Sequence, residues 1–438
     1  MRLGMEATKL IALLVASGLF LATYVAILSE RIHRAIASVI GAAAMVAAGT
    51  WLGFYDEASA FLGIDFNTIA LLFGMMILVG ILQKTGLFAY LAVRAAQLTR
   101  GNPVMLAVTL GLLTALLSTM LDNVTTIIVV APVTVSIAGL LGMSAVPLLM
   151  CEVLLSNIGG VATLVGDPPN ILIASAARFT FNDVLVHLAP IAVVAVVVTQ
   201  PLLLFLFRRD LRGTVKAREA VATLDARAAL VRPKEVRRLL VVFAGTVLLY
   251  LLHGELGIGP GLVALIGASA ALLWVRPPIE ELVKSVEWDV LLFFVGLFVI
   301  VGGMRAAGVL EFLANGISAL TTHGILLTAV VLLWASAVLS SLLGSIPITM
   351  VMIPILLTIT VQRVDAGPLW WALAIGAGFG GNGTPIGSAA GVLIVSISER
   401  AGAPISVREW LRTGVPATLA SCVIGSAGLA LAVWLGLF

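Results

Sequence analysis

LDNVTT (residues 121–126) and SNIGGVATLVGDPPN (residues 156–170) are polar interruptions of long apolar runs, and both have counterparts in the second half of the chain. Those counterparts are GSIPIT (residues 344–349) and GAGFGGNGTPIGSAAG (residues 376–391). Single residues recur at nearly the same spacing, about 222 positions: Gly74, Gly80, Gly86, Pro132 and Thr163 return as Gly296, Gly302, Gly308, Pro354 and Thr384. Paired broken helices in two matching halves of an apolar chain indicate the binding site of a transporter.

The composition places the chain in a membrane. Of its 438 residues 61% are hydrophobic and 11% are charged, and the mean hydropathy is +1.16. A soluble protein carries about 25% charged residues. The two cysteines lie in separate apolar runs and predict neither a disulfide framework nor a metal site. We therefore expect an all-α integral membrane protein with many spans, and exclude a soluble enzyme.

Ten segments are predicted to cross the membrane, and two are predicted to enter and leave on one side. The latter are re-entrant hairpins at 104–141 and 324–361, whose polar tips need protein or a watery cavity around them at membrane depth. Two crossings are broken helices, at 145–176 and 368–398. The other eight, whose apolar runs are long enough to span a bilayer, are 9–28, 35–53, 66–82, 186–207, 238–252, 260–274, 288–304 and 414–436.

The positive charges set the expected orientation. One side holds the loops 29–34, 83–103, 208–237, 275–287 and 399–413, which together with Arg238 carry 20 of the 25 Lys and Arg residues. The remaining five are Arg2, Lys9, Arg178, Arg305 and Arg363. Because cytoplasmic loops are rich in Lys and Arg, this side is predicted to be cytoplasmic in a bacterial-type plasma (inner) membrane, with both termini outside. Counting each hairpin as two crossings would leave this bias unchanged.

The same scheme predicts inverted repeats. Each half has five crossings, an odd number, so the two halves must run in opposite directions through the membrane. The first repeat is 1–207, a basic cytoplasmic linker covers 208–237, and the second repeat is 238–438. The first hairpin would enter from the cytoplasm and the second from the opposite face.

Three acids in the first half are candidates for proton coupling. Asp122 lies at a hairpin tip, where a charge at mid-membrane costs about 2.5–3.5 kcal/mol, so a carboxyl that exchanges protons is favoured; alternatively, Asp122 or Asn123 only caps the helix that follows. Asp167 precedes two prolines, a helix-start signal, and is an N-cap, a proton carrier or both. Glu152, five residues before the second break, is either a second proton carrier or a paired or near-surface acid.

The second half has neutral groups where the first has acids. Asp122, Asn123 and Asp167 align with Gly344, Ser345 and Ser388. None of the four interruptions contains Lys or Arg, so a neutral polyol-like solute or a small cation fits better than a di- or tricarboxylate. The predicted substrate-binding residues are small or polar residues of the four breaks: Asn123, Thr125, Thr126, Asn157, Gly159, Thr163, Ser345, Asn382, Gly383, Thr384 and Ser388.

The whole chain resembles the ion transporter superfamily. LDNVTTIIVVAPV and SNIGGVATLVGDPPN are similar to motifs of the branch that contains arsenite/antimonite efflux permeases, the melanosomal P protein and NhaD-type sodium/proton antiporters, and TPIGS (residues 384–388) is similar to arsenite permeases. The resemblance implies a transport domain that moves like an elevator against a scaffold, often in a homodimer. The chain departs from the branch at Gly344-Ser345, where an Asp-Asn pair is common, and at Gly391, where an Asn is common.

These observations predict a secondary antiporter that exports arsenite or antimonite, as the uncharged trihydroxide, in exchange for protons. A sodium/proton antiporter is the alternative, and a sodium/dicarboxylate symporter is less favoured. A channel would show no counter-ion dependence, and no nucleophile spacing supports an intramembrane enzyme. No cofactor or nucleic acid is expected, and because the chain has no phosphate-binding Gly-Lys-Ser/Thr loop, any ATP coupling would need a separate ATPase subunit.

Overall fold

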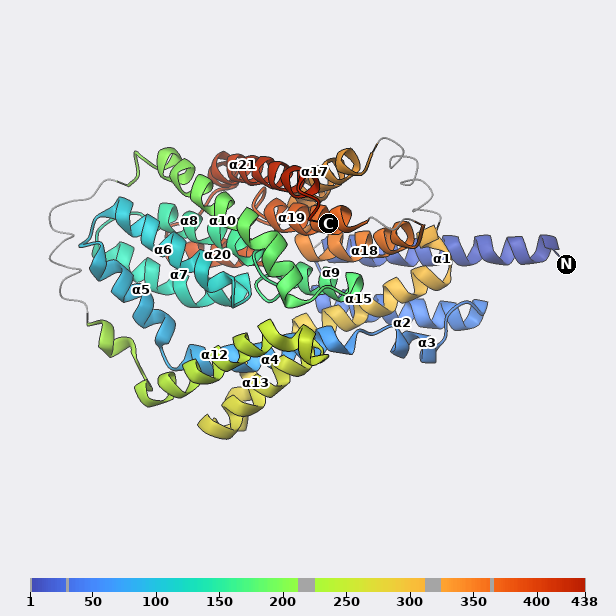
Figure 1. Cartoon of the computed structure of the whole chain (residues 1–438), viewed down its shortest axis with the longest axis horizontal. Helices are drawn as coiled ribbons and strands as arrows, with labels where there is room; N and C mark the ends of the chain where they lie inside the picture. Colours follow the sequence, from blue (N-terminus) through green and yellow to red (C-terminus); the bar gives the residue numbers. More distant parts are fainter. Residues whose placement is uncertain (1, 29–30, 212–224, 312–323, 363–365, 438) are drawn as a thin grey trace.

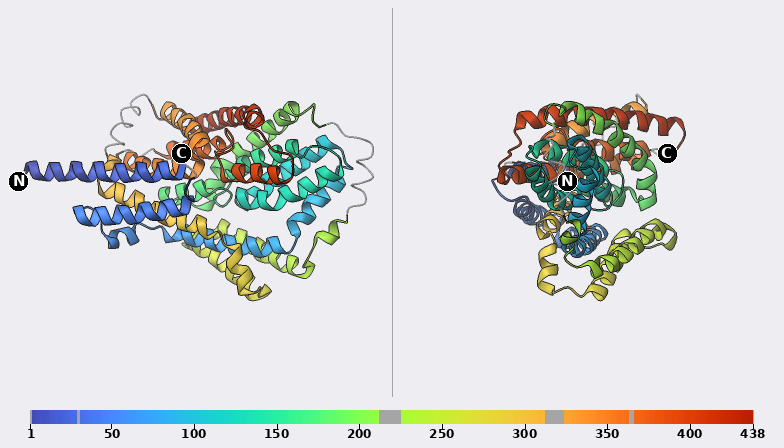
Figure 2. Two further views of the ribbon diagram at one scale, coloured as in Figure 1. Left: turned by 180° about the vertical axis from the view of Figure 1, so that it is seen from behind. Right: turned by 90° about the vertical axis from the view of Figure 1, so that its left-hand side faces the viewer.

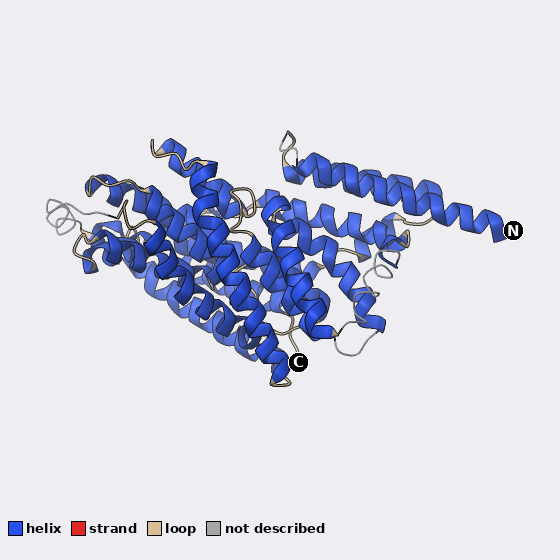
Figure 3. Cartoon of the chain, turned by 90° about the horizontal axis from the view of Figure 1, so that it is seen from above, coloured by secondary structure: helices blue, strands red, loops and turns tan. Residues whose placement is uncertain are grey.

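The computed structural model describes residues 2–28, 31–211, 225–311, 324–362 and 366–437. Within these ranges every regular element is a helix (Figure 3). The first half contains α1 (Arg2–Leu28), α2 (Arg34–Leu52), α3 (Glu57–Leu62), α4 (Phe66–Lys84), α5 (Leu87–Leu98), α6 (Pro103–Ser118), α7 (Asn123–Leu140), α8 (Val146–Gly160), α9 (Pro168–Ala177) and α10 (Phe181–Leu206). After the short helix η1 (Ala226–Ala229) come α12 (Pro233–Leu256), α13 (Pro260–Val275), α14 (Ile279–Ser285), α15 (Trp288–Ala306), α17 (Ile325–Leu343), α18 (Ser345–Gln362), α19 (Gly367–Gly380), α20 (Ala389–Arg400) and α21 (Val407–Trp434).

Nine of the described helices are long and apolar enough to cross a membrane: α1, α2, α4, α7, α10, α12, α15, α17 and α21. This confirms the prediction of an all-α protein with many spans. Two of the nine, α7 and α17, are arms of the predicted hairpins. The broken helices fall short because each consists of two shorter helices, α8 with α9 and α19 with α20.

The first halves of the broken helices, α8 and α19, lie in the interior of the protein, and Figure 1 shows α8 beside α6 and α10. Every residue of α8 is buried, and so is α19 from Pro368 to Gly380. Helices that are apolar on all faces belong in the interior. A Cβ on Gly159 would overlap the backbone of Ala115 in α6, and one on Gly380 would overlap Ala337 in α17. Glycine therefore permits both helices to approach their neighbours closely.

Helices that correspond between the halves have corresponding neighbours. The pair α6 and α8 corresponds to α17 and α19, and both pairs pack closely. Other contacts cross between the halves: α4 packs on α13 while α15 packs on α2, and α7 packs on α20 while α18 packs on α9. The last helices of the two halves, α10 and α21, pack on each other. Each hairpin thus contacts the second part of the other half's broken helix.

At one end of the molecule α1 and α2 project beyond the other helices (Figure 2). Leu10, Leu14 and Leu21 on α1 are each about 60% exposed, as expected for side chains that face lipid.

Several boundaries differ from the prediction. The second polar tip is a single residue, Gly344, with φ +92°, because α18 already begins at Ser345. The helix α12 starts at Pro233, five residues before the predicted start of the second repeat at 238. The helix α5 follows α4 in the first half, whereas residues 312–323, which follow α15 in the second half, lie outside the described residues. The centre of the basic linker, 212–224, also lies outside them.

Candidate functional site

Asp122 ends the first hairpin tip and begins α7. Its carboxylate accepts hydrogen bonds from the Thr125 backbone N–H at 2.8 Å and from the Thr125 hydroxyl at 2.6 Å. The Thr126 hydroxyl donates to the Asp122 backbone carbonyl at 3.0 Å. Asp122 is therefore the N-cap of the helix, as one reading of the sequence predicted. This capping role leaves room for a second role, since the same carboxyl also faces a cavity.

A chain of amide hydrogen bonds joins the tip to both broken helices. Asn123 Nδ2 donates to Asn157 Oδ1 at 3.0 Å. Asn157 Nδ2 in turn donates to Asn382 Oδ1 at 2.8 Å and to Ser388 Oγ at 2.9 Å. Asn382 Nδ2 donates to the Leu154 carbonyl at 2.9 Å. The predicted polar residues of the two breaks thus meet in the buried centre, and they satisfy one another there.

The threonine of each break is bonded to the hairpin of its own half. Thr163 Oγ1 donates to the Thr119 carbonyl, and Thr384 Oγ1 donates to the Ser341 carbonyl. Gly383 packs against the Ser341 side chain. These contacts fix each break to its hairpin, so the hairpin and the broken helix of each half form one packed unit.

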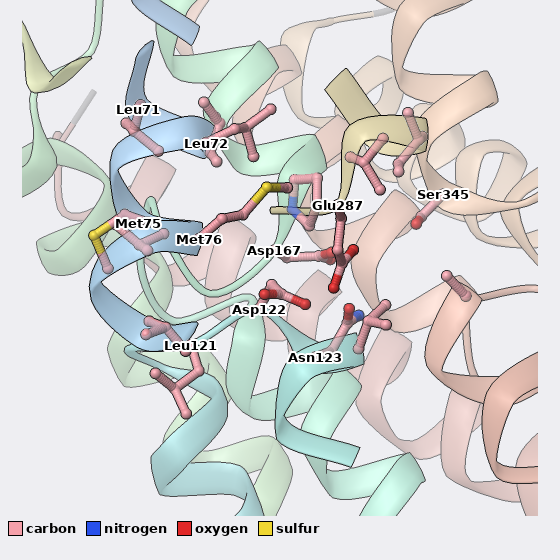
Figure 4. Close-up of a pocket in the computed structure, with 18 of the residues that line it drawn as sticks. Leu71, Leu72, Met75, Met76, Leu121, Asp122, Asn123, Asp167, Glu287 and Ser345 are labelled. Carbon is pink, nitrogen blue, oxygen red and sulfur yellow. The ribbon is translucent and has the colours of Figure 1, made fainter. Parts of the chain in front are cut away.

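A small cavity, about 50 Å³ in volume, lies beside the first tip (Figure 4). A water molecule needs roughly 10–15 Å³ measured in this way, so the cavity has room for a few waters or a monovalent ion. Four predicted site residues line it: Asp122, Asn123, Asp167 and Ser345. The other predicted residues do not line it; they are Thr125, Thr126, Glu152, Asn157, Gly159, Thr163, Asn382, Gly383, Thr384 and Ser388.

Asp167 faces this cavity without capping a helix. It occupies the predicted N-cap position of α9, but its side chain makes no capping hydrogen bond. The residue is only 3% exposed, and its Oδ2 lies against the backbone of α19 at Gly378. Burying a charged carboxyl is costly unless hydrogen bonds, a proton or a cation compensate the charge.

Glu152 lies elsewhere. It is fully buried on α8, where the Thr134 hydroxyl of α7 donates to its Oε1, and its Oε2 has no partner among the described residues. It is therefore not at the surface, and the structure places it apart from the other two acids, outside the cavity.

Glu287 is a cavity residue that the sequence reasoning missed. It lies directly before α15, is half-buried, and is drawn beside Asp122 and Asp167 in Figure 4. Burial, followed by the negative charges of Asp122 and Asp289, raises the pKa of Glu287 to about 8. A signal was available, because Glu287 stands 222 positions after Asp65, at the same place in the second half.

Arg34 is the one cation that lines the cavity among the described residues. Its guanidinium lies 3.6 Å from the Asp289 carboxylate, and it also lies over the Phe293 ring. Within the described ranges no group of His, Cys, Asp and Glu is arranged to hold a metal ion. Cys151 and Cys422 are free thiols in the core. Because three carboxyls and one guanidinium line the cavity, it carries more acidic than basic groups.

Comparison with known proteins identifies the family. Residues 24–376 match the family model described as citrate transporter. The chain is 40% identical over 435 residues to "Uncharacterized transporter Rv2684" of Mycobacterium tuberculosis, covering 97% of this chain and 98% of the relative.

This chain belongs to the citrate transporter family.

Two further proteins are similar to this citrate transporter family member. It is 30% identical to the human P protein, and the match covers 95% of this chain and 60% of that protein. Its fold resembles the crystal structure of the Alcanivorax borkumensis YdaH transporter, with a TM-score of 0.64 at 14% identity, over 92% of this chain and 99% of that one. It is thus a multi-pass membrane transporter and not an enzyme.

Proposed function

We propose that this protein is a secondary antiporter in which Asp122 and Asp167 bind protons, and that the exported solute carries no negative charge. One observation carries the proposal: three carboxyls, those of Asp122, Asp167 and Glu287, line a cavity whose one lining cation among the described residues is ion-paired elsewhere. Like charges in a small cavity cannot all stay ionised, so protons or cations bind there.

A monovalent cation such as sodium is the first candidate for the solute. The neutral groups that would hold an uncharged trihydroxide are already bonded to one another, as in the amide chain from Asn123 to Asn382. The carboxyl oxygens of the cavity, by contrast, suit a hard cation.

Arsenite or antimonite exchange for protons is the second candidate. It is supported by the similarity of TPIGS to arsenite permeases and by the lack of an unpaired cation among the described residues of the cavity. The name of the family suggests citrate, but a citrate anion would meet the three carboxyls without compensating positive charge. We therefore place a carboxylate substrate last.

The arrangement of the chain in the membrane is part of the proposal. Two inverted repeats, 1–207 and 238–438, would move the site between the two faces by an elevator motion. The basic loops would be cytoplasmic and both termini outside, in a bacterial inner membrane. A homodimer stays a prediction from the family resemblance, and a separate ATPase subunit stays a prediction from the missing phosphate-binding loop.

Everted membrane vesicles acidified by respiration test the proposal. A pH-sensitive dye in the vesicles should be dequenched by sodium chloride and remain quenched with choline chloride. Dequenching by potassium arsenite but not by sodium would select the second candidate. A response to citrate alone would refute both. If Asp122→Asn and Asp167→Asn each leave the response intact, the assignment of the proton-binding residues is wrong.

A further inference from the structure

Glu287 and Asp65 stand at equivalent places but make different contacts. Each is the residue before the first helix of its matched stretch, α15 or α4. Asp65 caps its helix, accepting hydrogen bonds from the Asn67 N–H at 3.0 Å and the Thr68 hydroxyl at 2.6 Å. Glu287 makes no side-chain capping hydrogen bond. Its longer side chain is directed into the cavity instead (Figure 4).

The two acids also differ in the residues that they contact in the hairpins and broken helices. Asp65 accepts a hydrogen bond from the Ser175 hydroxyl in α9, a contact between α4 and a broken helix. Glu287 faces the first hairpin tip, where the Thr125 side chain and the Asp122 carboxyl lie beside it. The second part of the first broken helix is thus hydrogen-bonded to Asp65, whereas Glu287 shares a cavity with Asp122 of the tip and Asp167 of the break.

The charges around Glu287 are mainly negative. Asp122 faces it from the tip and Asp289 from its own helix, while Arg34 at the start of α2 supplies one positive charge that Asp289 shares. Asp167 lines the same cavity, nine-tenths buried or more and without a capping bond. The three carboxyls come from two parts of the molecule. Asp122 belongs to the first hairpin and Asp167 to the first broken helix, whereas Glu287 directly precedes α15.

We propose that Glu287 is a third carboxyl of the proton- and cation-binding site and that it joins Asp122 and Asp167 only while the site faces the end of the molecule at which α15 begins. The proposal rests on the proposed function for its transport consequences. When the hairpin and break move along α15 toward the other face, Glu287 stays behind, and the site is left with two carboxyls. The site therefore binds cations more tightly at the face where Glu287 lies, which is the face predicted to be cytoplasmic.

Transport measured from each face separately tests the sidedness. The probe is sodium chloride, applied to everted and to right-side-out vesicles that contain the Glu287→Gln variant. We expect the apparent KM for sodium to rise about tenfold at the face where Glu287 lies, which everted vesicles are predicted to expose. It should stay within a factor of two at the other face, because only one state loses the negative charge of Glu287. The matched control is Glu280→Gln, an exposed acid in the neighbouring α14, which should change neither value. Equal changes at both faces, or no change at either, would overturn the proposal.

Thermal unfolding of the purified protein in detergent tests Glu287 without transport. A carboxyl whose pKa rises to about 8 on folding from an ordinary value of 4.5 holds its proton in the folded protein, so its stabilising effect is lost as the pH rises through that window. The unfolding temperature of the wild type should fall as the pH rises from 5 to 8. The unfolding temperature of the Glu287→Gln variant should fall measurably less over the same range. Identical pH profiles for the variant and the wild type would overturn the role of Glu287. Absent sodium- and arsenite-driven exchange in wild-type vesicles would instead refute the proposed function, and the two failures are distinguishable.

Discussion

The two halves of the molecule attach hairpin to broken helix by the same hydrogen bond, yet they differ in charge where that attachment meets the cavity. Thr163 bonds the Thr119 carbonyl in the first half, and Thr384 bonds the Ser341 carbonyl in the second. At the start of the following helix the first half has Asp167, whose side chain makes no capping hydrogen bond, and the second has Ser388, which accepts a hydrogen bond from the Gly391 N–H at 3.0 Å. A neutral residue is therefore sufficient to build this joint, so the joint by itself does not require a carboxyl at position 167.

The largest expected effect comes from replacing the Asp167 carboxyl with an amide. Asp167→Asn should lower proton-coupled exchange by at least about 100-fold, because an amide cannot bind and release a proton. Ser388→Ala should retain the coupling and lose only helix-cap and amide contacts, costing about 1 kcal/mol of stability. Dye-reported exchange in vesicles measures the first effect and thermal unfolding the second. Loss of coupling in Ser388→Ala, with Asp167→Asn active, would reverse the assigned difference between the halves.

Breaking the contact between the halves should have the next largest effect. Asn157→Ala removes three buried hydrogen bonds and leaves their partners on Asn123, Asn382 and Ser388 unsatisfied, so we expect a loss of about 3 kcal/mol in unfolding free energy. Denaturation in detergent checks the value. Asn182→Ala is the control, since this exposed residue gives up a single hydrogen bond to the Leu251 carbonyl. Similar losses in the two variants would show that the buried amide hydrogen bonds contribute no more to stability than one exposed hydrogen bond.

The equivalent threonines sharpen the comparison further. Thr163→Val and Thr384→Val each remove one hydroxyl bond to a hairpin carbonyl, which should cost about 1–2 kcal/mol. Thr163→Val also removes the hydrogen bond that Thr163 Oγ1 accepts from the Gly166 N–H at 3.1 Å, so it should cost about 1 kcal/mol more. A cost for one variant more than twice that for the other would show that the joints differ in strength as well as in charge.

The smallest effect is expected from the core thiol. Cys151 is fully buried and has no disulfide partner, so Cys151→Ser should change the rate of sodium or arsenite exchange by less than a factor of two. Exchange that depends on this thiol would mean that the solute is ligated by sulfur, contrary to the carboxyl-based site.

Sequence periodicity located the breaks and hairpins because a polar run inside an apolar one is visible without knowledge of the fold. It also selected Asp122 and Asp167, since acids at membrane depth are costly. It could not reveal that Asn157 bonds Asn382, 225 positions away, because only the packing of α8 beside the second break brings the two together. Nor did it select Glu287, which at the end of a span looks like an ordinary loop acid until the first hairpin tip is placed against it. For the same reason it could not reveal that the predicted neutral ligands Asn123, Asn157 and Asn382 are hydrogen-bonded to one another.

The bond between Asn157 and Asn382 has a consequence for how the protein is made. The ribosome completes α8 more than 200 residues before it reaches residue 382. During this interval the Asn157 amide lacks its hydrogen-bond partners Asn382 and Ser388. At 15 residues, with Glu152 and Asn157 among them, α8 is too short and too polar to be a stable span by itself. It must be sheltered by α6 and α10 during this interval, and the centre of the transporter closes only when the second broken helix arrives. A first half whose synthesis stops before residue 382 therefore lacks the partners that Asn157 has in the complete chain.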